Sequence, residues 1–448
     1  MFYASPLLPH PVPGHWLTLA LALGVGFSAP ASAQSLMDMY TAARGYDATY
    51  QSAKSLYDAT LAKGAQARAY LLPTIGLSAA VSRTHQEVVP QRESAFGGQS
   101  ATLALTQPLY NPANASFYEQ GLKQAALAQA QLSAAEQDLI VRVSQAYFDA
   151  LASADSLTFT KSQKTAVSEQ LAFAKRNFEV GTSTITDTRE AQARFDLVVA
   201  QELAAENDLL VKTLALTQLV GLPQAQPKTL AAPLALRPLE PADVNQWVDQ
   251  ALTNNPALQQ LQVALDVAKL ETSKAEAGHK PTLDLTGSYT AANNNGTATT
   301  VGDTRVNQAQ VGLSFKLPLF AGFAIQNRVK ETLALEDKAR SDLQAAQRTL
   351  GQTTRTAFYG VQSLQAQVKA FEAAEASSQS ALDANKLGYQ VGVRINIDVL
   401  NSQSQLFDTK AKLAKARYDV LMSGLKLRQA AGTLKADDLQ AVNAQLAP

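Results

Sequence analysis

The chain of 448 residues contains no cysteine. This absence excludes disulfides, thiolate zinc sites, iron–sulfur clusters and a cysteine nucleophile. Histidine is nearly as scarce, with four residues in total, so a histidine-rich metal site is not expected. The 38 basic residues are balanced by 38 acidic ones, and the lack of a basic surplus argues against a nucleic-acid partner. We therefore expect no metal, no cofactor and no nucleic acid.

Enzymatic motifs are missing as well. The sequence has no Gly-x-Ser-x-Gly, no P-loop, no His-Glu-x-x-His and no glycine fingerprint after a strand. Its many carboxylates lie in helix-forming segments, where solvated helix faces account for them. We therefore expect no catalytic residues and predict that the protein is not an enzyme.

Long apolar runs are almost absent. One stretch, from Trp16 to Phe27, precedes Ala31-Ser32-Ala33, whose small residues fit a cleavage site before Gln34. This predicts a signal peptide at residues 1–33, although no Lys or Arg precedes the apolar run; the alternative is a buried N-terminal helix. No other stretch approaches 18 apolar residues, so a transmembrane α-helix is not expected. The mature chain is predicted to be exported, and then to stay soluble or to cross a membrane as β-structure.

The sequence repeats itself. Ala146-Tyr147-Phe148 returns as Ala357-Phe358-Tyr359, 211 positions later. The pattern x-Pro-Thr at residues 72–74 returns at residues 280–282, and Pro-Leu-aromatic at residues 108–110 returns at residues 318–320. An internal duplication follows from these matches. We predict two structural repeats, 34–222 and 246–434, a proline-rich linker, 223–245, and a C-terminal segment, 435–448.

Each half contains two segments in which apolar and polar residues alternate. In the clearest one, Val311, Leu313 and Phe315 alternate with small or polar residues. Such alternation is typical of strands with one apolar and one polar face. The strands are predicted near residues 74–83, 101–108, 282–291 and 306–317, with polar loops at 84–100 and 291–305.

Most of the remaining sequence favours helices of unusual length. No proline interrupts the chain from about Asn114 to Phe178, or from about Gly322 to Tyr389. At 1.5 Å per residue, such a segment makes a helix roughly 100 Å long, and its heptad spacing of Leu and Ala predicts helices wound on their neighbours. A periplasmic coiled coil or an adhesive stalk without channel activity would explain these helices, but not the four strands.

Four strands are too few for a membrane. In hydrocarbon, β-structure must form a closed barrel, and the smallest such barrels have eight strands. The chain is therefore expected to oligomerise, and three copies would supply twelve strands and leave an open lumen.

At this point the chain resembles a known family, the TolC-like outer-membrane efflux proteins. The resemblance covers the whole mature chain and is carried by Leu36–Tyr40, Gly278–Leu285, Val311–Phe315 and Gly388–Arg394. It implies a mixed α/β membrane protein: a trimeric 12-stranded outer-membrane β-barrel, in contact with outer-membrane lipid, that continues into a long periplasmic α-helical coiled-coil barrel. The implied function is export through a tripartite system, in which a periplasmic adaptor and an inner-membrane ABC or proton-driven transporter dock on the duct. Cargo stays open between type I protein secretion and multidrug efflux.

The resemblance also implies the residues that matter. The two repeated turns are expected at the end farthest from the membrane, where the adaptor binds, although a simple hairpin cap would also explain their glycines. A gate is implied by links between the two hairpins, for which ordinary surface pairs are the alternative; its acidic ring is implied at Asp398, whereas Asn401 replaces the second acidic residue of the family. The implied adaptor-binding residues are Val180, Gly181, Thr182, Val391, Gly392 and Val393, and the implied gate residues are Thr186, Asp187, Tyr389, Arg394, Asp398 and Asn401.

Overall fold

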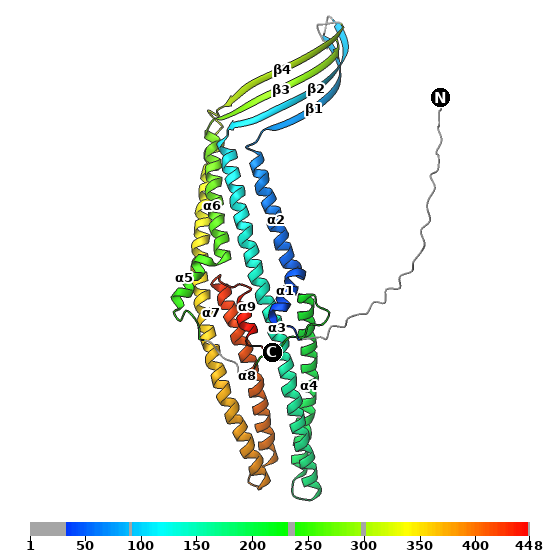
Figure 1. Cartoon of the computed structure of the whole chain (residues 1–448), viewed down its shortest axis with the longest axis vertical. Helices are drawn as coiled ribbons and strands as arrows, with labels where there is room; N and C mark the ends of the chain where they lie inside the picture. Colours follow the sequence, from blue (N-terminus) through cyan, green and yellow to red (C-terminus); the bar gives the residue numbers. More distant parts are fainter. Residues whose placement is uncertain (1–32, 89–91, 232–237, 297–301, 447–448) are drawn as a thin grey trace, which may run out of the picture.

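A computed structural model describes residues 33–88, 92–231, 238–296 and 302–446. The predicted signal peptide, apart from residue 33, lies outside the described residues. Two long helices run along most of the molecule, and a four-stranded sheet lies beyond one end of them (Figure 1). None of the described helices combines the length and the apolar character that a membrane-spanning helix requires.

The elements occur in the same order twice, so the internal duplication is confirmed. Each set consists of two helices, a β-hairpin, a very long helix and a return helix of about half its length. The first set is α1 (Leu36–Tyr46), α2 (Ala48–Ala69), β1 (Thr74–Val88), β2 (Arg92–Tyr110), α3 (Pro112–Glu179) and α4 (Ile185–Val220). The second set is α5 (Val244–Asn254), α6 (Pro256–Glu276) with the short 3-10 turn η1 (Ala277–His279), β3 (Thr282–Asn295), β4 (Asp303–Lys316), α7 (Ala324–Gln390) and α8 (Asn396–Ala430), after which α9 (Asp438–Asn443) follows.

The long helices begin and end at recognisable signals. The side chain of Asn111 caps α3 by accepting from the backbone N–H of Asn114, and Pro112 occupies the first helical position, where its missing N–H costs nothing. The helix then continues for 68 residues, and its counterpart α7 continues for 67. Within the chain, α3 packs against α2 and α6 in the half near the sheet and against α4 and α8 in the other half. It is therefore the central element of the chain.

The sheet has the order β1-β2-β3-β4, and every neighbouring pair is antiparallel. Leu77 lies opposite Leu103, which in turn lies opposite Tyr289, and the next positions on the other face place Thr102 opposite Thr290. One face is therefore apolar and the other polar, as the alternation predicts. Because the sheet is open, β1 and β4 are its two edges.

The strands extend beyond the predicted ones, and the prediction of polar loops at 84–100 and 291–305 is wrong for most of these residues. β1 runs to Val88, β2 starts at Arg92, β3 runs to Asn295 and β4 starts at Asp303. The predicted strands end where the apolar residues end, but backbone pairing continues into polar residues such as the pair Gln99–Asn293. The strands have 14 to 19 residues, more than the 9–11 that a bilayer crossing requires.

The largest core lies at the middle of the molecule, where α1, α3, α4, α8 and α9 meet. The phenol of Tyr147 is fully buried there and donates to the carbonyl of Lys228 at 2.9 Å, which holds the linker against α3. Nearby, the guanidinium of Arg142 donates to both oxygens of Asp47, which also caps α2. Fixed contacts of this kind make the middle of the chain a rigid base for the two helical hairpins.

The return helices end in the same way in both repeats. Gly221 and Gly432 follow α4 and α8 with φ of 70° and 69°, the left-handed region that favours glycine. A Cβ at Gly221 would lie 2.3 Å from the ring of Tyr46, and one at Gly432 would lie 2.5 Å from the backbone of Asn255. Each glycine thus allows the end of a return helix to touch the junction between the first two helices of its own repeat.

Candidate functional site

The two helical hairpins, α3–α4 and α7–α8, end at the pole of the molecule opposite the sheet (Figure 1). We call this pole, formed by turns 180–184 and 391–395 and the adjoining helix ends, the tip. In the first turn Gly181 has φ of 78°, and the N–H groups of Thr182 and Ser183 donate to the carbonyl of Asn177. In the second turn Gly392 has φ of 79°, and the next two N–H groups donate to the carbonyl of Gly388. The two turns therefore share one backbone design.

The residues predicted to bind an adaptor all lie in these turns and are all exposed. The exposed fraction is 72% for Val180 and 78% for Val393. These valines expose apolar surface, whereas a turn that only faces solvent usually exposes polar side chains. The six residues are Val180, Gly181, Thr182, Val391, Gly392 and Val393.

The turns differ in how the return helix starts. In the first, Thr184 and Asp187 form a capping box, in which the threonine hydroxyl accepts from the N–H of Asp187 and the carboxylate accepts from the N–H of Thr184. In the second, Ile395 occupies the position of the threonine and provides no side-chain cap. The equivalent carboxylate, that of Asp398, is therefore free of capping and lies 3.7 Å from the guanidinium of Arg394.

The environment of the Asp187 carboxyl favours its ionised form. Partial burial raises its pKa, but hydrogen bonds donated by Ser183 and Thr184 lower it by more, and the net shift is downward. A carboxylate at the first turn of α4 also faces the positive end of the helix dipole. Asp187 is thus negatively charged at neutral pH and engaged within its own turn.

Among the described residues, no side-chain hydrogen bond or ion pair joins Thr186 or Asp187 to Tyr389 or Arg394. The Asp187 carboxylate is used for capping, Arg394 pairs with Asp398 on its own hairpin, and Thr186 is exposed. The ring of Tyr389 packs edge-on against Phe173 of α3 at 5.7 Å between centroids. Its hydroxyl is buried without a hydrogen-bond partner among the described residues.

Hydrogen bonds from other residues also join the hairpins. The buried amide of Asn396 accepts from Gln170 of α3 at 2.5 Å and donates to the backbone carbonyl of Asp187 at 3.2 Å. Further along α8, the guanidinium of Arg194 of α4 donates to the side-chain amide oxygen (Oδ1) of Asn401 at 2.9 Å. Asn401 therefore has a partner, Arg194, that the sequence did not predict.

The sequence contains one signal for these missed residues. Asn396 occupies the position that Ile185 occupies in the first repeat, 211 residues earlier. A polar residue where the other repeat has an apolar one marks a position with a different neighbour. Arg194 has no comparable signal, because its partner depends on how two helices are rotated about their axes.

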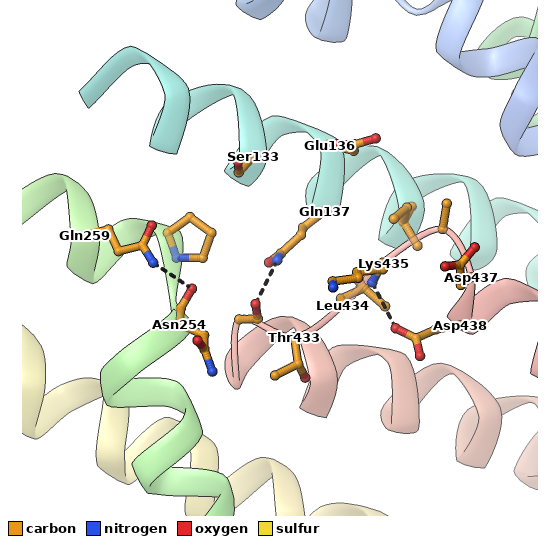
Figure 2. Close-up of a pocket in the computed structure, with 14 residues that line it drawn as sticks. Ser133, Glu136, Gln137, Asn254, Gln259, Thr433, Leu434, Lys435, Asp437 and Asp438 are labelled. Carbon is orange, nitrogen blue, oxygen red and sulfur yellow. Dashed lines mark hydrogen bonds between the residues drawn. The ribbon is translucent and has the colours of Figure 1, made fainter. Parts of the chain in front are cut away.

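A pocket of 780 Å³ lies away from the tip, in the middle of the molecule, and Figure 2 shows the residues that line it. It is bordered by α3, by the α5–α6 junction and by the segment that follows α8. The amide of Gln137 crosses it and donates to the carbonyl of Gly432 at 3.3 Å (Figure 2). None of the residues predicted from the sequence as sites lines this pocket.

Known proteins share this architecture. The family model described as outer membrane efflux protein matches residues 40–222 and 247–433, once for each repeat. The outer membrane protein TolC of Vibrio cholerae is 34% identical over 433 residues, covering 96% of this chain and 98% of that protein. The alkaline protease secretion protein AprF of Pseudomonas aeruginosa is 32% identical over 431 residues, covering 92% and 88%.

The fold is likewise that of solved outer-membrane channels. The crystal structure of the Campylobacter jejuni CmeC outer membrane channel superposes with a TM-score of 0.78 at 17% identity, covering 99% of this chain and 98% of that one. Because the family consists of channels, membership of this family confirms the expectation that the chain is not an enzyme. The chain therefore belongs to the outer membrane efflux protein family and is an exit duct of the outer membrane.

Proposed function

We propose that three copies of the chain close into one continuous duct, which exports cargo when a periplasmic adaptor and an inner-membrane transporter engage its tip. The observation that carries this proposal is that the two free edges of the chain resemble the two sides of its own repeat junction. Within the chain, β2 and α3 of the first repeat pack on β3, α6 and α8 of the second. The equivalent elements of the second repeat, β4 and α7, have no such neighbour among the described residues. We expect them to pack on β1 and α4 of another copy.

Side-chain exposure along the helices supports this reading. Leu425 of α8 is 3% exposed because it packs in the core against α3, whereas Leu214, its equivalent in α4, is 55% exposed. On the other edge, Phe148 of α3 is buried, whereas its equivalent Tyr359 in α7 is 55% exposed. These apolar positions gain a cover when α7 of one copy packs against α4 of the next. Burying such side chains contributes about 25 cal/mol per Å² of apolar area.

The sheet requires the same closure. One copy leaves two strand edges unpaired, and each unpaired backbone group in hydrocarbon costs several kcal/mol. Three copies give twelve strands, and a barrel of that size leaves a lumen. The polar face, with Thr102 and Thr290 side by side, would then line the lumen, and the apolar face would meet outer-membrane lipid.

At the tip, the six exposed positions from Val180 to Val393 provide an apolar surface for the adaptor. The gate assignment rests on Thr186, Asp187, Tyr389, Arg394, Asp398 and Asn401, to which the structure adds the bridge formed by Asn396. In the trimer, Asp398 would occur three times around the axis and attract cations. Asn401 carries no charge and bonds to Arg194, which lowers the expected strength of cation binding.

Both kinds of cargo fit this duct. AprF and the proteases secretion protein PrtF of Dickeya chrysanthemi are named for protein secretion, which favours type I secretion driven by an ABC transporter. The outer membrane efflux protein BepC of Brucella suis is named for efflux, which favours a proton-driven or ABC pump for small molecules. The cargo is then selected by the inner-membrane transporter, not by the duct.

Reconstitution of the purified protein into planar lipid bilayers tests the proposal. We expect discrete single-channel conductance from a species that native mass spectrometry measures as a trimer. A trimer without conductance would contradict a continuous duct, and a monomer would contradict the assembly. Export by cells that carry either an ABC transporter or a proton-driven pump, each with its adaptor, separates the two kinds of cargo.

A further inference from the structure

We propose that β4 of one copy pairs with β1 of the next in one particular register, in which Leu313 lies opposite Val81. The inference rests on the proposed trimer and specifies its seam. It follows from the internal duplication, because the chain already contains one junction of the same kind, between β2 and β3. The register of the β2–β3 junction can be transferred to the seam if the duplication preserves the pairing of equivalent residues.

The two β-hairpins show that equivalent residues keep the same pairing. Equivalent residues are 208 positions apart in β1 and β3 and 210 positions apart in β2 and β4, as the repeated motifs around Pro73 and Pro108 indicate. In the first hairpin Thr74 lies opposite Thr106. Applying the two shifts gives Thr282 opposite Lys316, which is the pairing observed in the second hairpin. The duplication therefore preserves backbone register.

The same shifts give the seam. Within the chain, Leu103 of β2 lies opposite Tyr289 of β3. The equivalent of Leu103 in β4 is Leu313, and the equivalent of Tyr289 in β1 is Val81. Both lie on the apolar face of the sheet, as antiparallel neighbours must if that face is to remain continuous.

The lengths of the strands provide an independent observation. β2 extends to Tyr110, and its last residues are paired with the beginning of β3, where Tyr110 lies opposite Leu283. The equivalent of Tyr110 is Phe320, yet β4 ends four residues earlier, at Lys316. Among the described residues, no strand pairs with the free edge of β4 in the way that β3 pairs with β2. β1 of the next copy supplies this pairing, so residues 317–320 complete the strand.

The side chains at both edges match this pairing. Leu317 and Leu319 follow β4 and are exposed, and Ile75 and Leu77 at the start of β1 are exposed as well. In the proposed register Leu317 lies opposite Leu77, so the apolar band continues across the seam. On the polar face the register places Ser314 opposite Ala80, two small residues that face the lumen.

Cysteine cross-linking tests the register directly, because the chain has no cysteine of its own. The variant Ala80→Cys with Ser314→Cys places the two Cα atoms about 5 Å apart across the seam, within the reach of a disulfide. Within one chain, Ala80 lies level with Val306 of β4, and Ser314 is eight residues further along that strand. The two Cα atoms are therefore roughly 30 Å apart within a chain, so any bond joins two copies. We expect oxidation to convert nearly all of the purified protein into covalent trimers on a non-reducing gel.

Two control variants carry the same number of cysteines on the same face. Ser78→Cys or Ser82→Cys, each combined with Ser314→Cys, moves one partner by two residues and separates the Cα atoms by about 8 Å, too far for a disulfide. If a control pair cross-links and the Ala80–Ser314 pair does not, the register is wrong. The register is also wrong if no pair cross-links in a protein that native mass spectrometry measures as a trimer. Neither result would contradict the trimer itself. A reduced protein that stays monomeric would overturn the proposed function and this inference together.

Discussion

Replacing Asn396 by alanine tests whether the two hairpins are held together where the structure joins them. The Asn396 amide is buried and makes two hydrogen bonds to the other hairpin, one from Gln170 and one to the backbone of Asp187. Each such bond contributes about 0.5–1.5 kcal/mol, and a buried group left without a partner costs about 1–3 kcal/mol. Asn396→Ala should therefore weaken the link by about 1–3 kcal/mol in each chain.

At about 1.4 kcal/mol per factor of ten, this shift changes the equilibrium between joined and separated hairpins by roughly 5- to 150-fold per chain. We expect Asn396→Ala to raise single-channel conductance or open probability in planar bilayers. Gln390→Ala is a matched control, because Gln390 lies in the same hairpin and is exposed. A trimeric Asn396→Ala protein with wild-type conductance and open probability would refute the reasoning.

The same recordings test the two charged residues assigned to the gate. We expect Asp187→Ala or Arg394→Ala to raise conductance or antibiotic leakage, and unchanged conductance in both would remove the gate assignment. Thermal unfolding separates their roles. Asp187→Ala also loses a helix cap worth about 0.5–2 kcal/mol, whereas the exposed pair of Arg394 and Asp398 contributes only about 0–1 kcal/mol.

Three further predictions concern pH, packing and ion selectivity. Because the folded pKa of Asp187 is lowered, its stabilisation is complete above the ordinary value of 3.8 and is lost as pH falls through the folded value. Asp187→Asn should therefore lower Tm at pH 7, and the difference should disappear in acid. Gly432→Ala should lower the free energy of unfolding by about 2–5 kcal/mol, because the new Cβ clashes with the α5–α6 junction in addition to the strain of a left-handed backbone. Gly181→Ala should lower it by only about 1–2 kcal/mol, because no atom lies within 4 Å of the new Cβ. Chemical unfolding measures both values. Asn401→Asp should increase block by multivalent cations, and adding Arg194→Ala should increase it further by removing the neutralising partner; equal block in both variants would contradict this.

Much of the fold could be predicted because its signals are periodic. Alternation over residues such as Val311–Phe315 identifies strands, and the absence of proline identifies the long helices. The strand ends could not be predicted, since pairs such as Gln99–Asn293 are held by backbone hydrogen bonds that leave no apolar pattern. Where the environment changes from lipid to water, hydropathy stops reporting on β-structure.

The tip was only partly predictable, for a similar reason. Gly181 and Gly392 mark the turns because a left-handed backbone favours glycine. The bond between Arg194 and Asn401 joins residues 207 positions apart and depends on helix rotation, which no local pattern encodes. Equivalent residues can also acquire different roles. Asp187 and Asp398 are matched by the duplication, yet a single change from Thr184 to Ile395 turns one carboxylate from a cap into a pairing partner.

The two uncovered edges of the sheet have a consequence for biogenesis. If three copies close the sheet as proposed, a newly exported chain cannot reach its final state alone, because β1 and β4 find their second partners only in another copy. Maturation of the proposed trimer would then depend on the local supply of subunits, and its insertion into lipid would be coupled to the encounter of three chains. Any cell that makes this protein has to keep the lone chain from mispairing along those edges during its passage through the periplasm.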